Sequence, residues 1–212
     1  MLSAVRLYLV VTPQRCRLDV ETVVKEALSG GVDLVQLRDK EAPDSDFAEL
    51  ARRLVPICRE SGVPLILNDR AALVEETGAD GVHVGKNDMT PEEVRERLGE
   101  KVLLGVSTHD RAEVAAAAAR GADYLGLGPM FPTRTKSLSR APRGAELIRE
   151  TAGATDLPVF PIGGITAATL PHLVAAGATR AAVSSAICAS PDPHRAAREL
   201  LGHLTITPQG SR

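Results

Sequence analysis

The sequence predicts a single-domain, closed (β/α)8 barrel of the TIM type from two observations. Short, mostly apolar runs alternate eight times with amphipathic helical patterns, in units of similar length. In addition, glycine, a packing residue and a polar residue precede four of the strands, at 31–33, 78–80, 121–123 and 177–179, as an αβ turn requires. An open doubly wound sheet is less favoured because no GxGxxG motif follows the first strand.

The expected strands are apolar along most of their length, which is typical of parallel strands buried on both faces. They cover residues 7–12, 34–40, 64–69, 81–86, 103–108, 124–130, 158–164 and 180–186. The barrel is expected to span residues 1–204. Residues 205–212 have no periodicity and are expected to form a flexible C-terminal tail.

Several helix ends can be located from capping residues. Thr90 and Glu93 form a capping box with Pro91 at the first helical position, and Gly99 follows where that helix should end. Thr166 is expected to cap the helix that follows the seventh strand.

Composition restricts the classes of partner. Lys and Arg nearly balance Asp and Glu (25 against 27), no basic run occurs, and aromatic residues make up only 2%, which argues against nucleic-acid binding. No apolar stretch is long enough to cross a membrane. Three widely spaced cysteines are typical of a reducing compartment. We therefore expect a cytoplasmic protein that acts on small molecules, with self-association into a homo-oligomer left open.

Polar side chains gather where the predicted strands end, and in a barrel all eight of these ends open onto the face that carries the active site. Gln36, Arg38 and Lys40 alternate along the end of the second strand, so they share the inward side and form a donor set for an anion. Asp69 and Asp88 follow the third and fourth strands. Two carboxylates facing phosphate donors are typical of a Mg²⁺ site, although each, taken singly, is more often a helix cap than a ligand.

Two further groups indicate phosphate binding. Pro129 and Pro132 take the chain out of the sixth strand into a loop that carries Thr133, Arg134, Thr135 and Lys136. Hydroxyls beside cations suit a phosphorylated ligand, and a solvated polar turn is the alternative. The seventh strand ends in Gly163 and Gly164 and the eighth in Ser184 and Ser185, which matches the common phosphate site of such barrels.

Two histidines lie near these strand ends. His83 is expected to pack within the fourth strand. His109 follows the fifth strand at the rim, where it can perform acid–base chemistry or have no role.

Six of these motifs, in order along the chain, resemble the thiamine-phosphate synthase family. They are Gln-Leu-Arg-Asp-Lys at 36–40, Asn-Asp-Arg at 68–70, His-Val-Gly-Lys-Asn-Asp at 83–88, Gly-Val-Ser at 105–107, Gly-Pro-Met-Phe-Pro-Thr-Arg-Thr-Lys at 128–136 and Ile-Gly-Gly-Ile at 162–165. The family is a (β/α)8 barrel that joins hydroxymethylpyrimidine diphosphate to a thiazole phosphate and releases pyrophosphate, with Mg²⁺. This chain departs from the family pattern at Lys86, where glutamine is usual.

The resemblance implies a role for each motif. The pyrimidine diphosphate would be held by Gln36, Leu37, Arg38, Asp39, Lys40, Asn68, Ser107 and Lys136, of which Arg38, Lys40, Ser107 and Lys136 would be catalytic. Asp69 and Asp88 would hold Mg²⁺. The thiazole phosphate would be held by Thr133, Arg134, Thr135, Gly164, Ser184 and Ser185. The family reacts by dissociation: pyrophosphate leaves first, and the thiazole nitrogen then captures a pyrimidine-stabilised cation. The sequence agrees, since it supplies charge for the leaving group and no evident protein nucleophile.

Three rival functions remain open at this stage. A thiazole tautomerase of the same lineage would use His109 and would need neither the carboxylate pair nor the full 133–136 loop. A non-catalytic phosphate-binding barrel is a second rival. An isomerase of the phosphate-binding barrels is the third, and it would require a matched acid–base pair that does not stand out here.

Overall fold

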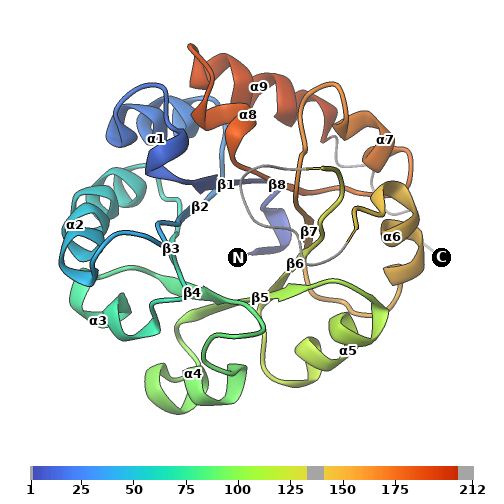
Figure 1. Cartoon of the computed structure of the whole chain (residues 1–212), viewed down its shortest axis with the longest axis horizontal. Coiled ribbons are helices and arrows are strands. Elements are labelled where there is room, and N and C mark those ends of the chain that lie inside the picture. Colours follow the sequence, from blue (N-terminus) through green and yellow to red (C-terminus); the bar gives the residue numbers. More distant parts are fainter. Residues whose placement is uncertain (1, 133–140, 205–212) are drawn as a thin grey trace.

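Eight parallel strands form a barrel inside a ring of helices, as the sequence predicts (Figure 1). The computed structural model describes residues 2–132 and 141–204. The strands are β1 (Leu7–Val11), β2 (Leu34–Leu37), β3 (Leu65–Asn68), β4 (Gly81–Val84), β5 (Leu103–Thr108), β6 (Tyr124–Leu127), β7 (Val159–Pro161) and β8 (Ala181–Val183). Their order is β7-β6-β5-β4-β3-β2-β1-β8, and a single parallel bridge between Ile162 and Ala182 brings the two edges together.

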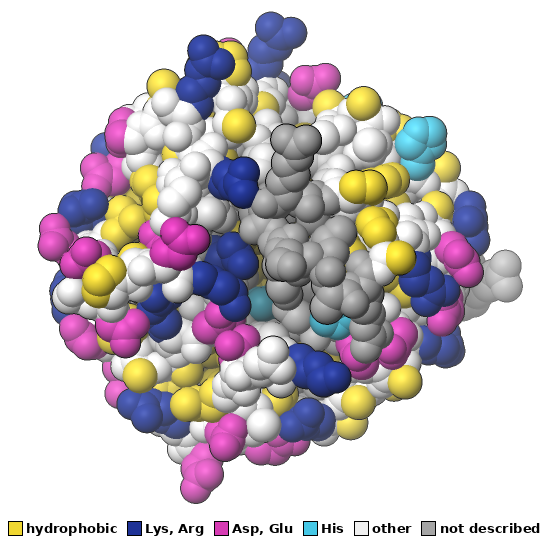
Figure 2. Space-filling model, viewed as in Figure 1, with side chains coloured by type: hydrophobic (Ala, Val, Ile, Leu, Met, Phe, Trp, Pro, Cys, Tyr) yellow, Lys and Arg dark blue, Asp and Glu magenta, His cyan; other side chains and the backbone are white. Residues whose placement is uncertain are grey.

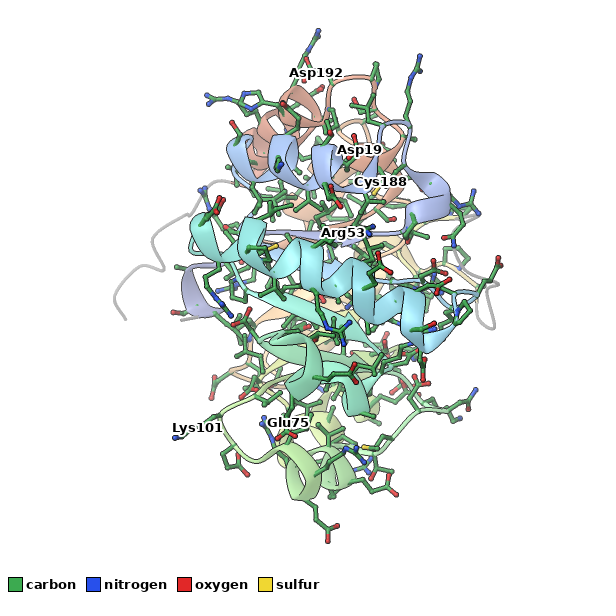
Figure 3. The ribbon with its side chains drawn as sticks, turned by 90° about the vertical axis from the view of Figure 1, so that its left-hand side faces the viewer. Asp19, Arg53, Glu75, Lys101, Cys188 and Asp192 are labelled. Atoms are coloured by element: carbon green, nitrogen blue, oxygen red, sulfur yellow. The ribbon has the colours of Figure 1, made fainter. Side chains whose placement is uncertain are left out.

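The helices follow the strands around the ring. They are α1 (Val20–Ser29), α2 (Asp44–Glu60), α3 (Val74–Thr77), α4 (Pro91–Leu98), α5 (Arg111–Ala119), α6 (Gly144–Thr151), α7 (Leu170–Val174), α8 (Ser185–Cys188) and α9 (Pro193–His203), with short 3₁₀ turns at Leu2–Ala4, Pro13–Arg15 and Ala71–Leu73. Arg53 lies on the outer surface of α2 (Figure 3). It pairs with Glu21 of α1 at 2.6 Å and so links neighbouring helices. None of the helices in the described part of the chain is long and apolar enough to cross a membrane.

All eight predicted strands are present, but most end earlier than predicted. β6 stops at Leu127 because Pro129 has no N–H to donate to the ladder. β7 stops at Pro161, and Gly163 and Gly164 then turn with φ of 105° and 64°, which only glycine adopts readily. Several residues predicted at strand ends, such as Arg38, Asp69 and Gly164, therefore lie in the loops that follow the strands.

The helix-end predictions have two outcomes. The capping box of Thr90 and Glu93 and the terminal Gly99 are confirmed at α4. The prediction that Thr166 caps the helix after the seventh strand is wrong, because α7 begins at Leu170. Thr166 instead starts a turn, in which its carbonyl accepts from the N–H of Leu170 at 2.9 Å.

The structure has two apolar cores, one on each side of the strands. The larger core lies between strands and helices. The smaller one fills the barrel and contains Tyr8, Tyr124 and Phe160, whose rings meet edge to face at 5.4–5.7 Å. Leu2 and Val5 precede β1 and join this inner core, so the N-terminal segment plugs the end of the barrel at which the strands begin (Figure 1).

Three of the glycine-containing turns end in an aspartate that anchors the neighbouring strand. Asp33 accepts from the N–H of Leu7 at 2.9 Å, Asp80 from that of Leu65 at 2.9 Å, and Asp123 from that of Leu104 at 2.7 Å. Each bond joins the turn before one strand to the start of the preceding strand. The repeat seen in the sequence is thus a set of side-chain staples at the amino end of the barrel.

We predict that Asp80→Ala destabilises the fold by about 1–3 kcal/mol, because it leaves the buried N–H of Leu65 without an acceptor. Thr179→Ala is the matched control, since Thr179 stands at the same position of the fourth repeat and is exposed. Among the described residues, its side chain accepts only from the adjacent Arg180. The effect of this control should stay within about 0.5 kcal/mol. Urea unfolding measures the stability of both variants, and equal losses of stability would contradict the anchoring role of Asp80.

Candidate active site

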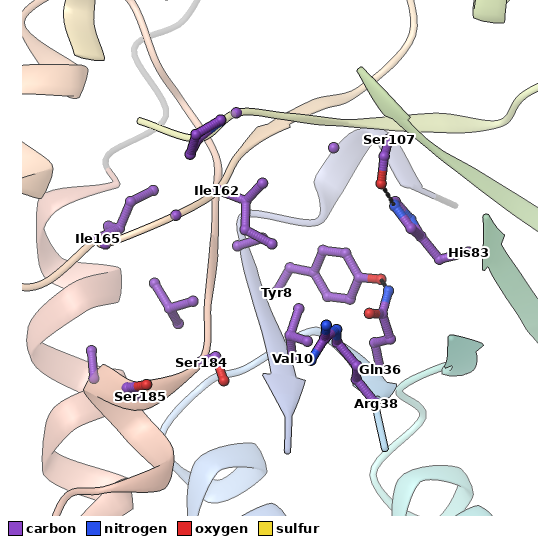
Figure 4. Close-up of a pocket in the computed structure, with 18 of the residues that line it drawn as sticks. Tyr8, Val10, Gln36, Arg38, His83, Ser107, Ile162, Ile165, Ser184 and Ser185 are labelled. Carbon is purple, nitrogen blue, oxygen red and sulfur yellow. Dashed lines mark hydrogen bonds between the residues drawn. The ribbon is translucent and has the colours of Figure 1, made fainter. Parts of the chain in front are cut away.

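A cavity of about 500 Å³ opens at the carboxyl ends of the strands (Figure 4). Residues from β1 to β6, from β8 and from the segments after β1, β2, β5, β6, β7 and β8 line it. The residues with polar side chains among them are Tyr8, Arg15, Gln36, Arg38, Asn68, His83, Ser107, Thr108, His109, Thr166, Ser184 and Ser185. The strand-end clusters of the sequence therefore converge on one site, as a barrel requires.

On the β2 side of the cavity, two donors have no acceptor. The half-buried Arg38 guanidinium makes no hydrogen bond to any described residue, and burial lowers its pKa although Asp69 and Asp39 oppose that shift. Asn68 Nδ2 is buried and has no partner within the described chain. Burying such groups is costly unless a ligand supplies the acceptors, so this side is built for an anion. Lys and Arg side chains also gather near the centre of this face of the barrel, towards α1 and α2 (Figure 2).

On the β8 side of the cavity, a second group of donors also has no acceptor among the described residues. The Ser184 hydroxyl is buried without a hydrogen-bond partner among the described residues, and the Gly164 N–H donates to none of them. Both border the cavity together with Ser185. The N–H of Phe131 donates to the Gly163 carbonyl at 2.9 Å, so the loop after β6 starts beside this group. The arrangement offers hydroxyl and amide donors to a second anionic group.

Two carboxylates lie together at the rim. Asp69 adopts φ of 64°, uncommon outside glycine, and binds Lys40 Nζ at 2.8 Å. Asp88 accepts from the N–H of Gly85 at 2.8 Å, and burial, followed by the proximity of Asp69, raises its pKa. In residues 2–132 and 141–204 no group of three or more His, Cys, Asp or Glu is placed to hold a metal. Paired oxygen donors that repel each other nevertheless fit a hard divalent cation that keeps most of its water.

The other residues predicted to bind substrate do not line the cavity or are not described. Leu37 is fully buried and packs in the outer core, away from the cavity. Asp39 accepts from the N–H groups of Glu41 and Ala42, both at 3.1 Å, and so shapes the loop after β2. Thr133, Arg134, Thr135 and Lys136 lie outside the described residues.

The two histidines border the cavity in different ways. His109 lies at the rim, where its Nδ1 contacts Glu113 Oε2 of α5 at 2.8 Å. His83 is buried in β4 as predicted, yet its Nε2 lies 2.9 Å from Ser107 Oγ. The packing role expected for His83 is therefore incomplete, because the ring also supports a residue at the cavity wall.

Sequence reasoning missed Arg15, Tyr8 and Tyr124. Arg15 follows β1 in a short turn and reaches the cavity wall. Tyr8 and Tyr124 are almost fully buried inside the barrel, and their hydroxyls lie 2.9 Å apart. The sequence signal for the two tyrosines is a tyrosine in an otherwise aliphatic strand, since a buried hydroxyl requires a partner.

Comparison with known proteins identifies the family. The family model for thiamine monophosphate synthase matches residues 7–187. The chain belongs to the thiamine monophosphate synthase family. It is 44% identical over 186 residues to a putative thiamine-phosphate synthase of Geobacter sulfurreducens, covering 88% of this chain and 87% of the relative. It is 46% identical over 182 residues, or 86% of its length, to the thiamine-phosphate synthase of Synechococcus sp. WH7803, of which it spans only 51%.

Solved structures agree with the family membership. Thiamine phosphate pyrophosphorylase from Pyrococcus furiosus superposes with a TM-score of 0.84 and 30% identity, over 94% of this chain and 95% of that one. The TIM barrel and the family resemblance inferred from the motifs are thereby confirmed. This member of the thiamine monophosphate synthase family is a transferase of thiamine biosynthesis, rather than a non-catalytic binding barrel.

The interior below the cavity leaves no room for an added methyl group at Gly105. A Cβ there would lie 2.2 Å from Tyr124 Cζ and 2.4 Å from His83 Nδ1. We predict that Gly105→Ala costs about 1–3 kcal/mol by overpacking. Gly202→Ala is the matched control, because a Cβ added there would meet nothing within 4 Å and α9 favours alanine at this position by about 0.5–1 kcal/mol. Thermal unfolding compares the two, and a stable Gly105→Ala protein would contradict the tight packing.

Proposed function

We propose that this synthase joins 4-amino-2-methyl-5-hydroxymethylpyrimidine diphosphate to 4-methyl-5-(2-phosphooxyethyl)thiazole and releases pyrophosphate. One observation carries the proposal: a single cavity holds two separate sets of donors that have no partner among the described residues. Arg38 and Asn68 form the set beside β2 and β3, and Ser184 and Gly164 form the set beside β7 and β8. A reaction that joins two phosphorylated molecules needs two such sets. The assignment of the diphosphate to the β2 side follows the family resemblance.

The proposed chemistry is a dissociative substitution. The bond between the pyrimidine methylene carbon and the diphosphate oxygen breaks, and its electron pair leaves with pyrophosphate. The thiazole nitrogen then supplies the electron pair of the new carbon–nitrogen bond. Negative charge grows on the leaving group as the first bond breaks, so Arg38 and Lys40 stabilise the transition state more than the bound substrate. Lys136 is proposed to do the same, and Ser107 and Gln36 to orient the pyrimidine.

Asp69 and Asp88 are the residues proposed to hold Mg²⁺. Their mutual repulsion, which contributes to the raised pKa of Asp88, would be relieved by a divalent cation. When bound, Mg²⁺ supplies positive charge to diphosphate oxygens. Lys40 already neutralises part of this charge through its 2.8 Å contact with Asp69. A cytoplasmic location is part of the same proposal, and Cys16, Cys58 and Cys188 are all free thiols.

The decisive experiment is incubation with both phosphorylated substrates and Mg²⁺, with pyrophosphate release as the readout. We expect EDTA to abolish turnover and Mg²⁺ to restore it. Asp88→Asn keeps an oxygen for the Gly85 N–H but removes the charge, so it should lose activity without unfolding. Mg²⁺ alone should stabilise the wild type, by about 2.7 kcal/mol at 100 times its dissociation constant, and should not stabilise Asp88→Asn.

Asp192→Asn is the matched control for this charge removal. Asp192 caps α9 by accepting from the N–H of Arg195 at 2.8 Å, and asparagine caps equally well. The control should keep both the activity and the Mg²⁺ stabilisation. Full activity of Asp88→Asn in EDTA would refute the metal assignment, and no pyrophosphate from the wild type would refute the synthase reaction.

The sequence left a thiazole tautomerase open, and the family match does not favour that function, although one contact allows it to be tested. His109 faces the cavity with Nδ1 held by Glu113, which is an arrangement suited to acid–base chemistry. In a synthase, His109→Asn should keep most coupling activity. In a tautomerase, the same change should reduce thiazole isomerisation by ~10²–10⁴-fold. Parallel coupling and isomerisation assays of the wild type and this variant separate the two functions.

A further inference from the structure

A continuous chain of polar side chains crosses the inside of the barrel. Gln36 Nε2 donates to Tyr8 Oη, which lies 2.9 Å from Tyr124 Oη. Tyr124 Oη lies 3.3 Å from His83 Nδ1, and His83 Nε2 lies 2.9 Å from Ser107 Oγ. The five residues come from β2, β1, β6, β4 and β5 in that order. Figure 4 shows both ends of this chain at the cavity wall.

The hydrogens along this chain have one consistent order. The Gln36 amide nitrogen can only donate, so the Tyr8 oxygen accepts from it. The single Tyr8 hydrogen then has Tyr124 Oη as its acceptor in the described chain, and the Tyr124 hydrogen has His83 Nδ1. In the reverse order, the Tyr8 hydrogen would be buried without an acceptor, which native interiors avoid. Burial also raises the pKa of both tyrosines, so both hydroxyls keep their hydrogens.

This order fixes the chemistry at the cavity wall. His83 Nδ1 accepts, so the neutral ring carries its hydrogen on Nε2 and donates it to Ser107 Oγ. The Ser107 hydroxyl hydrogen is then directed away from His83, towards the cavity that Ser107 lines. The Gln36 amide oxygen remains the acceptor at the other end. The chain thereby makes Ser107 a donor and Gln36 an acceptor towards a ligand.

We infer that Tyr124 is a positioning residue, which sets the tautomer of His83 and through it the hydrogen-bond direction of Ser107. Tyr124 is fully buried and does not line the cavity, so it acts on a ligand only through its neighbours. Its hydroxyl reaches His83 because residue 105 is glycine: a Cβ there would lie 2.4 Å from both the Tyr124 oxygen and His83 Nδ1. The inference deepens the proposed function, on which the identity of the ligand rests.

Tyr124→Phe and Tyr8→Phe form a matched pair that tests this order in the ligand-free protein. Each variant removes one buried hydroxyl from the same contact. Without the Tyr8 hydroxyl, the Tyr124 hydrogen can still be donated to His83 Nδ1. Without the Tyr124 hydroxyl, Nδ1 has lost its donor. A purely structural role would make the two variants alike.

The readout is ¹⁵N NMR of histidine-labelled protein at about pH 8, above the ordinary histidine pKa. The chain has five histidines, and the His83 signals are assigned by their loss in His83→Asn. We expect the Nε2–H tautomer in the wild type and in Tyr8→Phe, and a smaller fraction of that tautomer in Tyr124→Phe, because the hydrogen bond that favours it is lost. An Nδ1–H tautomer in the wild type would overturn the inference, as would identical His83 signals in the two tyrosine variants.

A kinetic measurement connects the tautomer to the proposed reaction. Tyr124→Phe should lower kcat/KM for the pyrimidine diphosphate about tenfold, as expected for one weakened hydrogen bond, and leave KM for the thiazole phosphate unchanged. Equal effects on both substrates would indicate a distorted barrel and contradict a positioning role. The NMR result needs no substrate, so failure of the proposed reaction and failure of this inference remain distinguishable.

Discussion

The structure depends on the requirement that polar atoms inside a closed barrel find partners there. The interior of eight short strands is filled by side chains, and Tyr8, Tyr124 and Phe160 occupy most of its middle. Tyr8 and Tyr124 satisfy their hydroxyls through each other and through neighbours on β2 and β4. Among the polar groups with no such partner in the described part of the chain, those of Arg38, Asn68 and Ser184 line the cavity at the open end.

This division between satisfied and unsatisfied groups separates scaffold from site. The amino end of the barrel is closed by the N-terminal segment and fastened by Asp33, Asp80 and Asp123, each of which accepts from a strand N–H. The carboxyl end instead keeps donors that have no acceptor among the described residues, and carboxylates that repel each other. Hydrogen bonds at the amino end thus stabilise the fold, whereas these unpaired polar groups at the carboxyl end lower its stability and form the site.

Positive and negative side chains nearly balance at the rim of the site. Lys40 pairs with Asp69, while Asp88 remains beside Asp69 with a raised pKa. Arg38 has no hydrogen bond to a described residue and is the more available cation. The nearly neutral chain therefore concentrates charge of both signs at one rim, which is consistent with the proposed binding of a diphosphate together with a cation.

The sequence by itself determined the eight βα units, the capped start of α4 and the strand ends that carry the site. Apolar period, capping residues and turn glycines are local signals, and they do not depend on what lies across the barrel. Only the tertiary structure decided which polar residues meet. Tyr8 and Tyr124 are 116 positions apart, and His83 and Ser107 belong to different strands, so no local pattern predicts their contacts. Leu37 and Asp39 illustrate the converse: they belong to a motif at a strand end, yet one packs outward and the other shapes a loop. The strand pleat and the loop geometry, rather than the motif, decide which of its side chains face the cavity.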